Sequence, residues 1–489
     1  MSPVDMQFKS ATLFLFGSLG TLMFQGCYTV GPDYVSPATT MPDAWSRSVL
    51  RDLDGGAASL SQWWKNFNDP TLNALVEQAR HYNPDLRAAL GRISEARALR
   101  GVAVSQALPQ ANAGGDFTRS RRSENLLAPP STDNPSNLYS AGFDAGWEID
   151  LFGGIRRSVE AADANIGARE EDYRDALVSL FADVALNYVE YRTLELRISV
   201  ALRNIAAQRD SAGLTSQRLD AGLVPRIDVT QAETNLYLSE ATVPLLRSQL
   251  VSSRNRLSTL TGGFPGSLDG MLNQSRGIPM PKAGFSAGLP CDLLRARPDI
   301  RRAERELAAQ TALIGVAEAD LYPRLTLFGD FRLESVSSGN LFDSASRAYS
   351  FGPSFQWQIF SAGRIRNTIL AEESRASQAL ASYESAVLKG VEEVETSMAG
   401  IVYERERLSD LGQAVASSRE TVNLVKDNYR NGLVSFQNVL DAERTKFSAE
   451  DEEIASRGQI ALKYITLYKA LGGGTETVLT PSKAPVGEN

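Results

Sequence analysis

The protein has 489 residues, a formal net charge of −8 and 43% hydrophobic residues. The acidic balance argues against a nucleic-acid binder, which needs a basic face. The single histidine, His81, and the two cysteines, Cys27 and Cys291, are too few for a zinc cluster of ordinary spacing. No Gly-x-x-x-x-Gly-Lys phosphate-binding loop is present in the sequence. We therefore expect neither enzyme activity nor a cofactor.

The first residues predict a targeting segment. Lys9 precedes an apolar run at residues 11–23, which is too short to span a bilayer comfortably. The run leads into Phe24-Gln25-Gly26-Cys27, which resembles a bacterial lipoprotein signal, where a small residue precedes an acylated cysteine. An ordinary cleaved signal with an incidental cysteine is the alternative. We predict a signal peptide at 1–26 and a lipid anchor at Cys27, and we interpret Cys291 as a small buried residue.

Each half of the remaining chain opens with a helical stretch that begins at a proline, Pro84 to about Ala107 and Pro298 to about Leu321. Two strand-like segments follow in each half. The clearest strands are predicted at residues 139–151 and 349–360, where aromatic and aliphatic residues alternate with polar ones.

These segments have the pattern of transmembrane β-strands, which are about ten residues long with one apolar and one polar face. Strands of a soluble sandwich alternate in the same way. Aromatic residues near the strand ends and long polar loops between the strands favour the membrane. Four strands cannot close a barrel, since the smallest membrane barrels need about eight. An open edge in lipid would leave backbone groups without partners, so we expect several chains to share one barrel.

A very long helix is predicted after each pair of strands. From Arg156 to Ala221 and from Arg366 to Asn431 the chain contains no proline, so each helix would extend roughly 100 Å. Apolar residues there are spaced alternately by four and three, which is typical of supercoiled helices. They are Leu177, Phe181, Val184, Tyr188 and Tyr191 in the first helix and Val387, Val391, Val394, Met398 and Ile401 in the second.

A Gly-Leu-Val tripeptide interrupts each long helix, at Gly222 and at Gly432, and predicts a turn into a second helix. The second helices run to about Leu260 and Leu471. The tripeptide occurs twice because each half has its own helix-to-helix turn.

The chain is internally duplicated. Trp147 returns as Trp357 with an offset of 210 residues, and the same offset relates the two tripeptides. Upstream, Pro109 returns as Pro323 with an offset of 214 residues. The matches stay in order through segments that are not helical, so chance similarity between helices does not explain them. Such a duplication predicts two similar structural units.

Several motifs occur together in a recognisable order. They are "VGPDYVSP" after Cys27, "WWKNFNDPTLNALVEQARHYNPDL" from Trp63, "LRARPDIRRAE" from Leu294, and the two Gly-Leu-Val turns. In this order they resemble the outer-membrane factor family of tripartite efflux systems, the TolC- and OprM-like proteins, in its lipoprotein branch. The resemblance covers nearly the whole mature chain. It implies a mixed fold, in which a trimer forms a twelve-stranded outer-membrane β-barrel and a long α-helical barrel of twelve helical columns in the periplasm.

The resemblance also implies an organisation along the chain. A signal peptide (1–26) is followed by a lipidated N-terminal segment with an equatorial helix (27–83), a first structural repeat (84–263), an equatorial linker (264–297), a second structural repeat (298–473) and a C-terminal tail (474–489).

The family's binding positions fall on the two turns. The resemblance implies that these tips dock on a periplasmic adaptor protein, which is itself bound to an inner-membrane pump. The matching residues are Gly222, Leu223 and Val224 in the first tip and Gly432, Leu433 and Val434 in the second.

The family also narrows its tunnel near the tips with acidic rings and latches between neighbouring helices. Asp441 matches a ring position, whereas Asn438 stands where some members have a second aspartate. Asp228 and Tyr429 match latch positions. Val434 replaces the basic latch partner. The candidate substitutes are Arg226 and Arg430.

The sequence therefore predicts a passive outer-membrane exit channel of a tripartite efflux pump. Its expected partners are two further copies of the chain, the adaptor, the pump and outer-membrane lipid. An exit duct for type I polypeptide secretion is the alternative with the same fold. A passive uptake porin would not need helices of roughly 100 Å, and a periplasmic coiled-coil scaffold would not need the strands around Trp147 and Trp357.

The lipid anchor can be tested directly. We expect labelled fatty acid to enter the wild-type protein and to be absent from Cys27→Ser. Function should largely persist in the variant, since the barrel already holds the protein in the membrane and the acyl chains add only about 0.8 kcal/mol per buried CH₂. Equal labelling of the two proteins would exclude the anchor.

Overall fold

The computed structural model describes residues 29–38, 60–121, 123, 125, 135–274, 276–281 and 297–475. Cys27 and Cys291 lie outside these residues, so the statements about them stay predictions. The chain divides into two compact units. The strand unit comprises Met1–Pro37, Ile93–Ala168 and Ala303–Ser382, and the helix unit comprises Ala38–Arg92, Arg169–Arg302 and Tyr383–Asn489.

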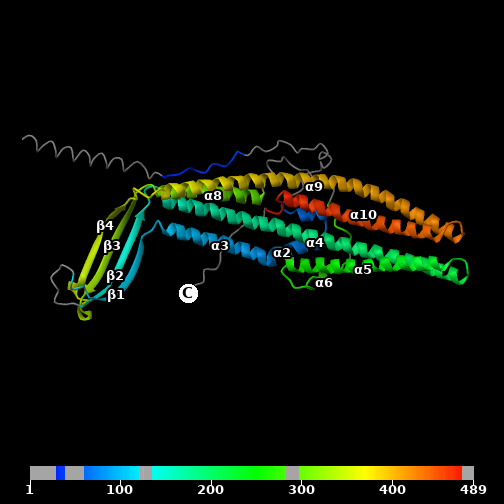
Figure 1. The fold of residues 1–489 in the computed structure, drawn as a ribbon, viewed down its shortest axis with the longest axis horizontal. Helices are drawn as coiled ribbons and strands as arrows, with labels where there is room; N and C mark the ends of the chain where they lie inside the picture. Colours follow the sequence, from blue (N-terminus) through cyan, green and yellow to red (C-terminus); the bar gives the residue numbers. More distant parts are fainter. Residues whose placement is uncertain are drawn as a thin grey trace, which may run out of the picture. The chain divides into compact units, whose positions relative to one another are not determined.

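The two halves of the chain repeat one order of elements (Figure 1). The first half contains α3 (Pro84–Ser105), β1 (Gln110–Ser120), β2 (Ser136–Ile149), α4 (Gly154–Asp220) and α5 (Arg226–Leu260). The second half contains α8 (Pro298–Ala319), β3 (Arg324–Ser335), β4 (Arg347–Gln356), α9 (Arg364–Arg430) and α10 (Phe436–Ala470). The duplication predicted from the sequence is confirmed. Both long helices begin two residues before their expected starts, and α5 continues through Pro244.

Short elements complete the described chain. They are η2 (Trp63–Phe67), α2 (Pro70–Tyr82), α6 (Asp269–Leu272), η3 (Ser338–Asn340) and η4 (Ser344–Ser346). Among the residues that the structure describes, no helix is both long and apolar enough to cross a membrane.

The four strands of the strand unit form one antiparallel sheet in the order β1-β2-β3-β4. In its register Phe143 lies opposite Ala113 and Phe331, whereas Ser140 lies opposite Asp116 and Glu334. Odd-numbered strand residues therefore share one face, which we name the apolar face. Even-numbered residues share the other, which we name the polar face. The alternation predicted for β2 is confirmed.

Strand β4 is shorter than the sequence predicts. It ends at Gln356, which pairs with Arg324, the first residue of β3. Pro323 precedes β3 and has no N–H to extend the pairing. Trp357 and Ile359 therefore lie beyond the sheet, although their alternation continues that of the strand.

Trp147 and Trp357 make equivalent contacts in the two halves. The indole N–H of Trp147 donates to the carbonyl of Ala107 at 2.8 Å, and that of Trp357 donates to the carbonyl of Leu321 at 3.0 Å. Each accepting carbonyl lies just after the end of α3 or α8, where helix carbonyls lose their own partners. The repeated tryptophans thus fasten strands to the ends of the preceding helices.

The N-terminal residues 29–36, which we name the strap, are held within the strand unit by Arg157 of α4. The guanidinium of Arg157 is almost fully buried and donates to the carbonyls of Val30 and Gly31, both at 3.0 Å. A Cβ on Gly31 would lie 2.3 Å from the Cα of Gly315 in α8, so only glycine permits this approach. The strap is therefore packed against the helices.

The core of the helix unit is aromatic and aliphatic. Trp63 stacks on Tyr468 with ring centroids 5.1 Å apart, and Trp64 packs edge-on against Phe181 of α4 at 4.8 Å. All five positions of the predicted apolar repeat in α4 are buried in this core. Asp69 caps α2 by accepting from the N–H groups of Thr71 and Leu72, as expected before a helix that starts with proline.

A buried arginine connects this core to α6. Arg192 of α4 donates to the hydroxyl of Tyr188 at 3.1 Å, to Glu195 at 2.6 Å and to the carbonyl of Leu272 at 3.2 Å. The Tyr188 hydroxyl donates in turn to Asp69 at 2.9 Å. Burial raises the pKa of Tyr188, which keeps its hydroxyl protonated as the donor. The buried charge is thus paired and hydrogen-bonded, as burial requires.

Candidate functional site

The two turns that the sequence singles out have the same backbone geometry. Gly222 and Gly432 have φ values of 72° and 73°, a left-handed conformation that glycine adopts without strain. The N–H of Leu223 donates to the carbonyl of Arg218 at 2.8 Å, and that of Leu433 donates to Asn428 at 2.9 Å. These six-to-one bonds define Schellman caps. A Cβ added to either glycine would meet open space, so the positive φ, and not close packing, requires glycine.

Side chains at the turns divide into exposed and anchoring residues. Leu223 is 66% exposed and Leu433 is 72% exposed. Val224 and Val434 are half-buried against a small cluster formed by α5, α9 and α10, which contains Ala232, Tyr429, Phe436, Val439 and Leu440. In each tip, therefore, the leucine is exposed to solvent, and the following valine anchors the turn by packing against the cluster. Two equivalent leucines suit a docking surface for another protein.

The cluster beneath the tips holds an interaction that the sequence did not predict. The guanidinium of Arg218, at the end of α4, lies 4.6 Å from the ring centroid of Tyr429 and donates to the Tyr429 carbonyl at 2.8 Å. Tyr429 also packs on Phe436 with ring centroids 5.3 Å apart. Arg218 therefore ties the first repeat to the second. The only local feature of the sequence that pointed to this contact was the position of Arg218, a basic residue in the last turn of a helix.

The predicted latch residues do not contact one another within one chain. Asp228 lies in the first turn of α5, and Arg226 is exposed beside it. Arg430 pairs with Asp427 at 3.1 Å, one turn earlier on its own helix. Tyr429 is buried, and its hydroxyl has no hydrogen-bond partner among the described residues. Within one chain Tyr429 thus contacts Arg218 rather than Asp228, and a latch through Asp228, Arg226 or Arg430 stays a prediction.

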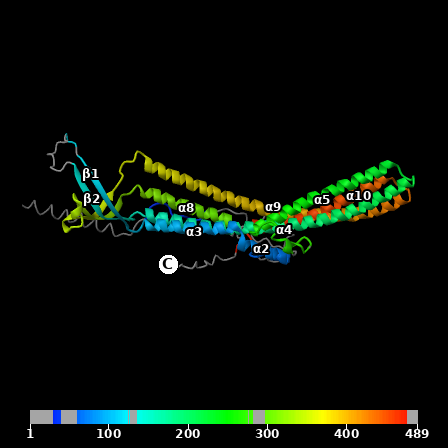
Figure 2. The ribbon, with the colours of Figure 1, turned by 90° about the horizontal axis from the view of Figure 1, so that it is seen from below.

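Helices α4, α5, α9 and α10 lie side by side towards the tips in both views (Figures 1 and 2). Between the two repeats a polar seam runs alongside the apolar clusters. Glu443 of α10 pairs with Lys426 of α9 at 2.7 Å and accepts from Ser211 of α4 at 2.7 Å. Glu443 is only 6% exposed, and these two partners supply the hydrogen bonds and the opposite charge that a buried carboxylate needs.

The polar seam repeats seven residues further along all three helices. Glu450 of α10 accepts from Arg419 of α9 at 2.8 Å and from Asn204 of α4 at 3.1 Å. Burial, the largest single effect, would raise the pKa of Glu450, but the hydrogen bonds from Arg419 and Asn204 and the charges of Lys446 and Arg419 together lower the pKa. The seam therefore has the seven-residue period of supercoiled helices, with polar groups between the repeats.

Asp441, the predicted ring residue, lies on the exposed side of α10. Its carboxylate accepts from Gln437 of the same helix at 3.1 and 3.2 Å. Arg444 is 4.0 Å away and largely exposed, so this pair contributes little. Asn438 is exposed one turn earlier. The Asp441 carboxylate is therefore open to solvent in one chain and free to face copies of itself.

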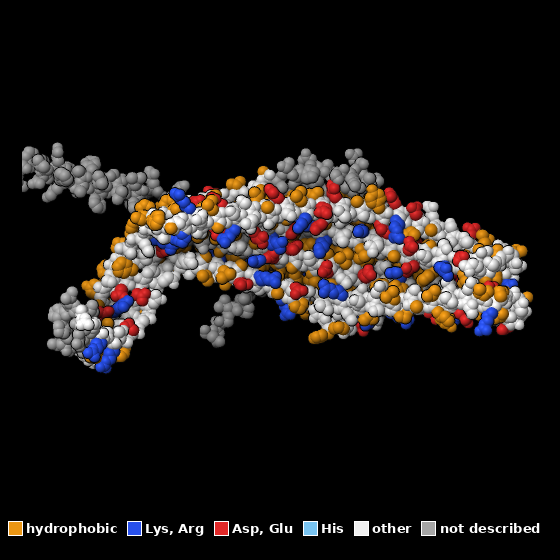
Figure 3. Space-filling model, viewed as in Figure 1, with side chains coloured by type: hydrophobic (Ala, Val, Ile, Leu, Met, Phe, Trp, Pro, Cys, Tyr) orange, Lys and Arg blue, Asp and Glu red, His pale blue; other side chains and the backbone are white. Residues whose placement is uncertain are grey.

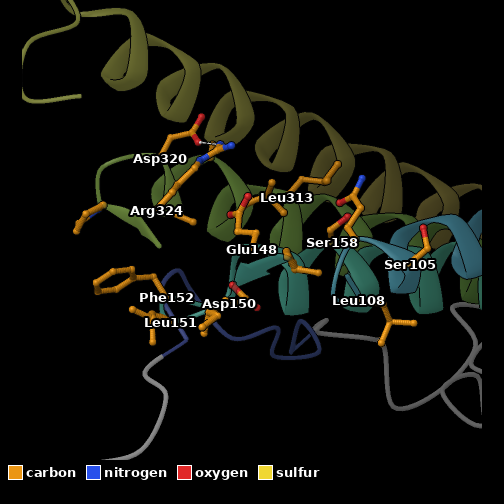
Figure 4. Close-up of a pocket in the computed structure, with 18 of the residues that line it drawn as sticks. Ser105, Leu108, Glu148, Asp150, Leu151, Phe152, Ser158, Leu313, Asp320 and Arg324 are labelled. Carbon is orange, nitrogen blue, oxygen red and sulfur yellow. Dashed lines mark hydrogen bonds and ion pairs between the residues drawn. The ribbon is translucent and has the colours of Figure 1, made fainter. Parts of the chain in front are cut away.

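A hollow lies within the strand unit, where the sheet meets α3, α4, α8 and α9 (Figure 4). Its volume is about 810 Å³. Acidic side chains on its wall include Glu148, Asp150 and Asp320, and Asp320 pairs with Arg324 at 2.5 Å. No group of three His, Cys, Asp or Glu side chains placed to hold a metal ion occurs in the described part of the chain. The hollow is lined by apolar as well as polar side chains, the apolar ones including Leu108, Ile149 and Leu313.

Comparison with known protein families identifies the family of this chain. A family model described as outer membrane efflux protein matches residues 75–263 and 289–473, one match for each repeat. The chain belongs to the outer membrane efflux protein family.

Curated relatives match over nearly their full length. The chain is 31% identical to the outer membrane protein OprJ of Pseudomonas aeruginosa, over 92% of this chain and 93% of that protein. It is 30% identical to the solvent efflux pump outer membrane protein SrpC of Pseudomonas putida, over 96% of this chain and 99% of that protein.

Among solved structures, the outer-membrane channel OprN aligns with a TM-score of 0.84 and 37% identity, covering 91% of this chain and 99% of that one. The family and this likeness confirm three predictions: the fold class, the outer-membrane location and the role in efflux.

The contact between Arg218 and Tyr429 can be tested through the stability of the tip. Arg218→Met keeps the apolar stem but removes the charge and the hydrogen bond to the Tyr429 carbonyl. The loss should be about 1–2 kcal/mol, the sum of a cation–π contact and one hydrogen bond. Amide hydrogen exchange should therefore accelerate at residues 425–440.

The matched control is Arg203→Met on the same helix, since Arg203 is exposed and, within the described part of the chain, donates only to Ser199. It should leave exchange at residues 425–440 unchanged. Equal protection in wild type and Arg218→Met would show that the contact does not hold the tip.

Proposed function

We propose that three copies of this chain form a passive exit channel of a tripartite efflux pump. The observation that carries the proposal is the four-stranded sheet, which has an apolar face and two strand edges, β1 and β4, without partners in the described chain. An edge in hydrocarbon would leave backbone groups unsatisfied. Joining β4 of one copy to β1 of the next removes both edges, and three copies give twelve strands.

The two faces of the sheet support the orientation of this barrel. Exposed residues of the apolar face include Phe143, Phe331, Phe351 and Phe355, which suit contact with lipid. The polar face carries carboxylates such as Asp144, which accepts from Asn112 at 3.0 Å. We therefore assign the apolar face to the membrane and the polar face to a water-filled lumen.

The strap supports the lipid anchor at Cys27. A Cβ added to Gly153 would lie only 2.7 Å from the side chain of Thr29, so the two residues are in close contact. The N–H of Val30 donates to the carbonyl of Phe152 at 3.0 Å. Both contacts are at the junction between β2 and α4. Cys27 is only two residues before Thr29, so its acyl chains would enter the membrane beside the barrel.

The tips support docking of a periplasmic adaptor, itself bound to an inner-membrane pump. Gly222, Leu223 and Val224, with Gly432, Leu433 and Val434, give six similar turns in a trimer. The relative SrpC is described as part of a solvent efflux pump, which favours efflux of small molecules over type I secretion of polypeptides. We propose no reaction and no cofactor for the chain itself, because its role is conduction.

Assembly in the membrane tests the proposal. Native mass measurement of the purified protein in detergent should give three chains per particle. Phe143→Asp should block this assembly, because a charge on the lipid side of a barrel costs on the order of 2 kcal/mol per copy. Gln356→Asp, on the polar face of β4 and opposite Arg324 of β3, is the matched control and should assemble. A stable monomer that needs no detergent would refute the proposal.

Conduction tests the proposed constriction at Asp441. Three-fold symmetry would bring three Asp441 carboxylates around one axis, a ring that attracts cations. The trimer in planar bilayers should be cation-selective and blocked by divalent ions, and Asp441→Asn should weaken both properties. Assembly should persist, because the substitution relieves repulsion between like charges.

The control for Asp441→Asn is Asp427→Asn, which removes an exposed carboxylate in the last turn of α9. It should conduct like the wild type. Unchanged selectivity and divalent block in Asp441→Asn would remove the constriction from the proposal without affecting the trimeric channel.

A further inference from the structure

The apolar face of the sheet carries only two charged side chains, and both are arginines. Arg119 is in β1 and Arg347 in β4, and the odd-numbered positions of the four strands contain no aspartate or glutamate. By contrast, all the acidic residues of the strands lie on the polar face. An arginine on a lipid-facing surface is unfavourable unless it lies near the membrane boundary.

Both arginines lie at the end of the sheet away from the helices. Arg119 is the penultimate residue of β1 and pairs in register with Asn137, and Arg347 is the first residue of β4 and pairs with Leu333. Figure 3 shows basic side chains gathered at this free end of the sheet. In the proposed orientation this end is the outer boundary of the membrane.

The two arginines differ from the arginines of the polar face in their partners. Arg324 pairs with Asp320, and Arg332 pairs with Asp330, both at 2.5 Å. Arg119 and Arg347 are exposed and have no carboxylate within ion-pair distance among the described residues. Their guanidinium groups therefore lack an anion from the described part of the chain.

Each of these arginines is next to an aromatic residue on the same face, one step further into the apolar band. Phe117 precedes Arg119 by two residues and packs on Tyr139 with ring centroids 4.7 Å apart. Tyr349 follows Arg347 by two residues and is 73% exposed. A ligand that fits such a site has an anionic head at the arginine and hydrocarbon along the rings.

We propose that Arg119 and Arg347 bind the phosphate groups of the phosphorylated glycolipid in the outer leaflet. Guanidinium groups form strong, often bidentate, hydrogen bonds with phosphate, and the acyl chains would lie on the apolar face. The proposal rests on the trimeric barrel of the proposed function. There β4 of one copy joins β1 of the next, so Arg347 and the partner subunit's Arg119 flank the same junction, and the lipid covers it.

The test uses the purified full-length trimer in detergent, with binding followed by native mass spectrometry. The probes are lipid A with two phosphates, the same lipid after removal of its phosphates, and phosphatidylglycerol. The wild type should retain the phosphorylated glycolipid preferentially. Arg119→Gln with Arg347→Gln should abolish the preference, since each basic residue near an anionic membrane surface contributes about fivefold in affinity.

Arg332→Gln is the matched control, because it removes the same charge from the polar face and should keep the preference. If the double variant does not assemble, the retention of phosphorylated and dephosphorylated lipid by the wild-type trimer still tests the proposal. Equal retention of those two lipids, or stronger retention of phosphatidylglycerol, would overturn the proposal. Failure of the wild type to form a three-chain particle would refute the proposed function instead.

Discussion

The backbone hydrogen bonds at the edges of a sheet are the constraint on which this protein depends. One chain supplies strands β1 to β4, and its two outer strands have N–H and C=O groups that lipid cannot satisfy. Closing the barrel therefore requires other copies, and the proposed trimer would impose three-fold symmetry on everything attached to the strands. The long helices α4 and α9 follow β2 and β4 directly, so the same symmetry would arrange them around one axis.

Because the chain is duplicated, the same residue types make the same contacts in both halves. Trp147 and Trp357 fasten strands to helix ends, and Gly222 and Gly432 end the long helices in the same Schellman cap. The repeats meet through two kinds of contact. Buried carboxylates at Glu443 and Glu450 pair across α9 and α4, so this contact is polar and specific, whereas the core around Trp63 is apolar. A shift of these helices would separate the pairs, and an unpaired buried charge is strongly unfavourable.

The charges of the sheet and of the tips have different physical roles. In the proposed barrel, carboxylates on the polar face border water and act on what passes through the lumen. In the same barrel, arginines on the apolar face border lipid and have no carboxylate of the described chain to neutralise them. Asp441 is exposed in one chain and gains its proposed role only when three copies meet. Each role follows from which solvent, water or hydrocarbon, a position faces.

The sequence by itself determined what depends on backbone period. Alternation at Phe143 identified the face of β2, the four-and-three spacing around Tyr188 identified the buried stripe of α4, and Gly222 marked a turn that needs positive φ. Only the tertiary structure decided contacts between distant segments. Arg218 meets Tyr429, Arg157 holds the strap, and β4 stops at Gln356 because β3 starts only after Pro323. Local patterns fix which side of an element is buried, but a partner is chosen by the packing of elements far apart in the chain.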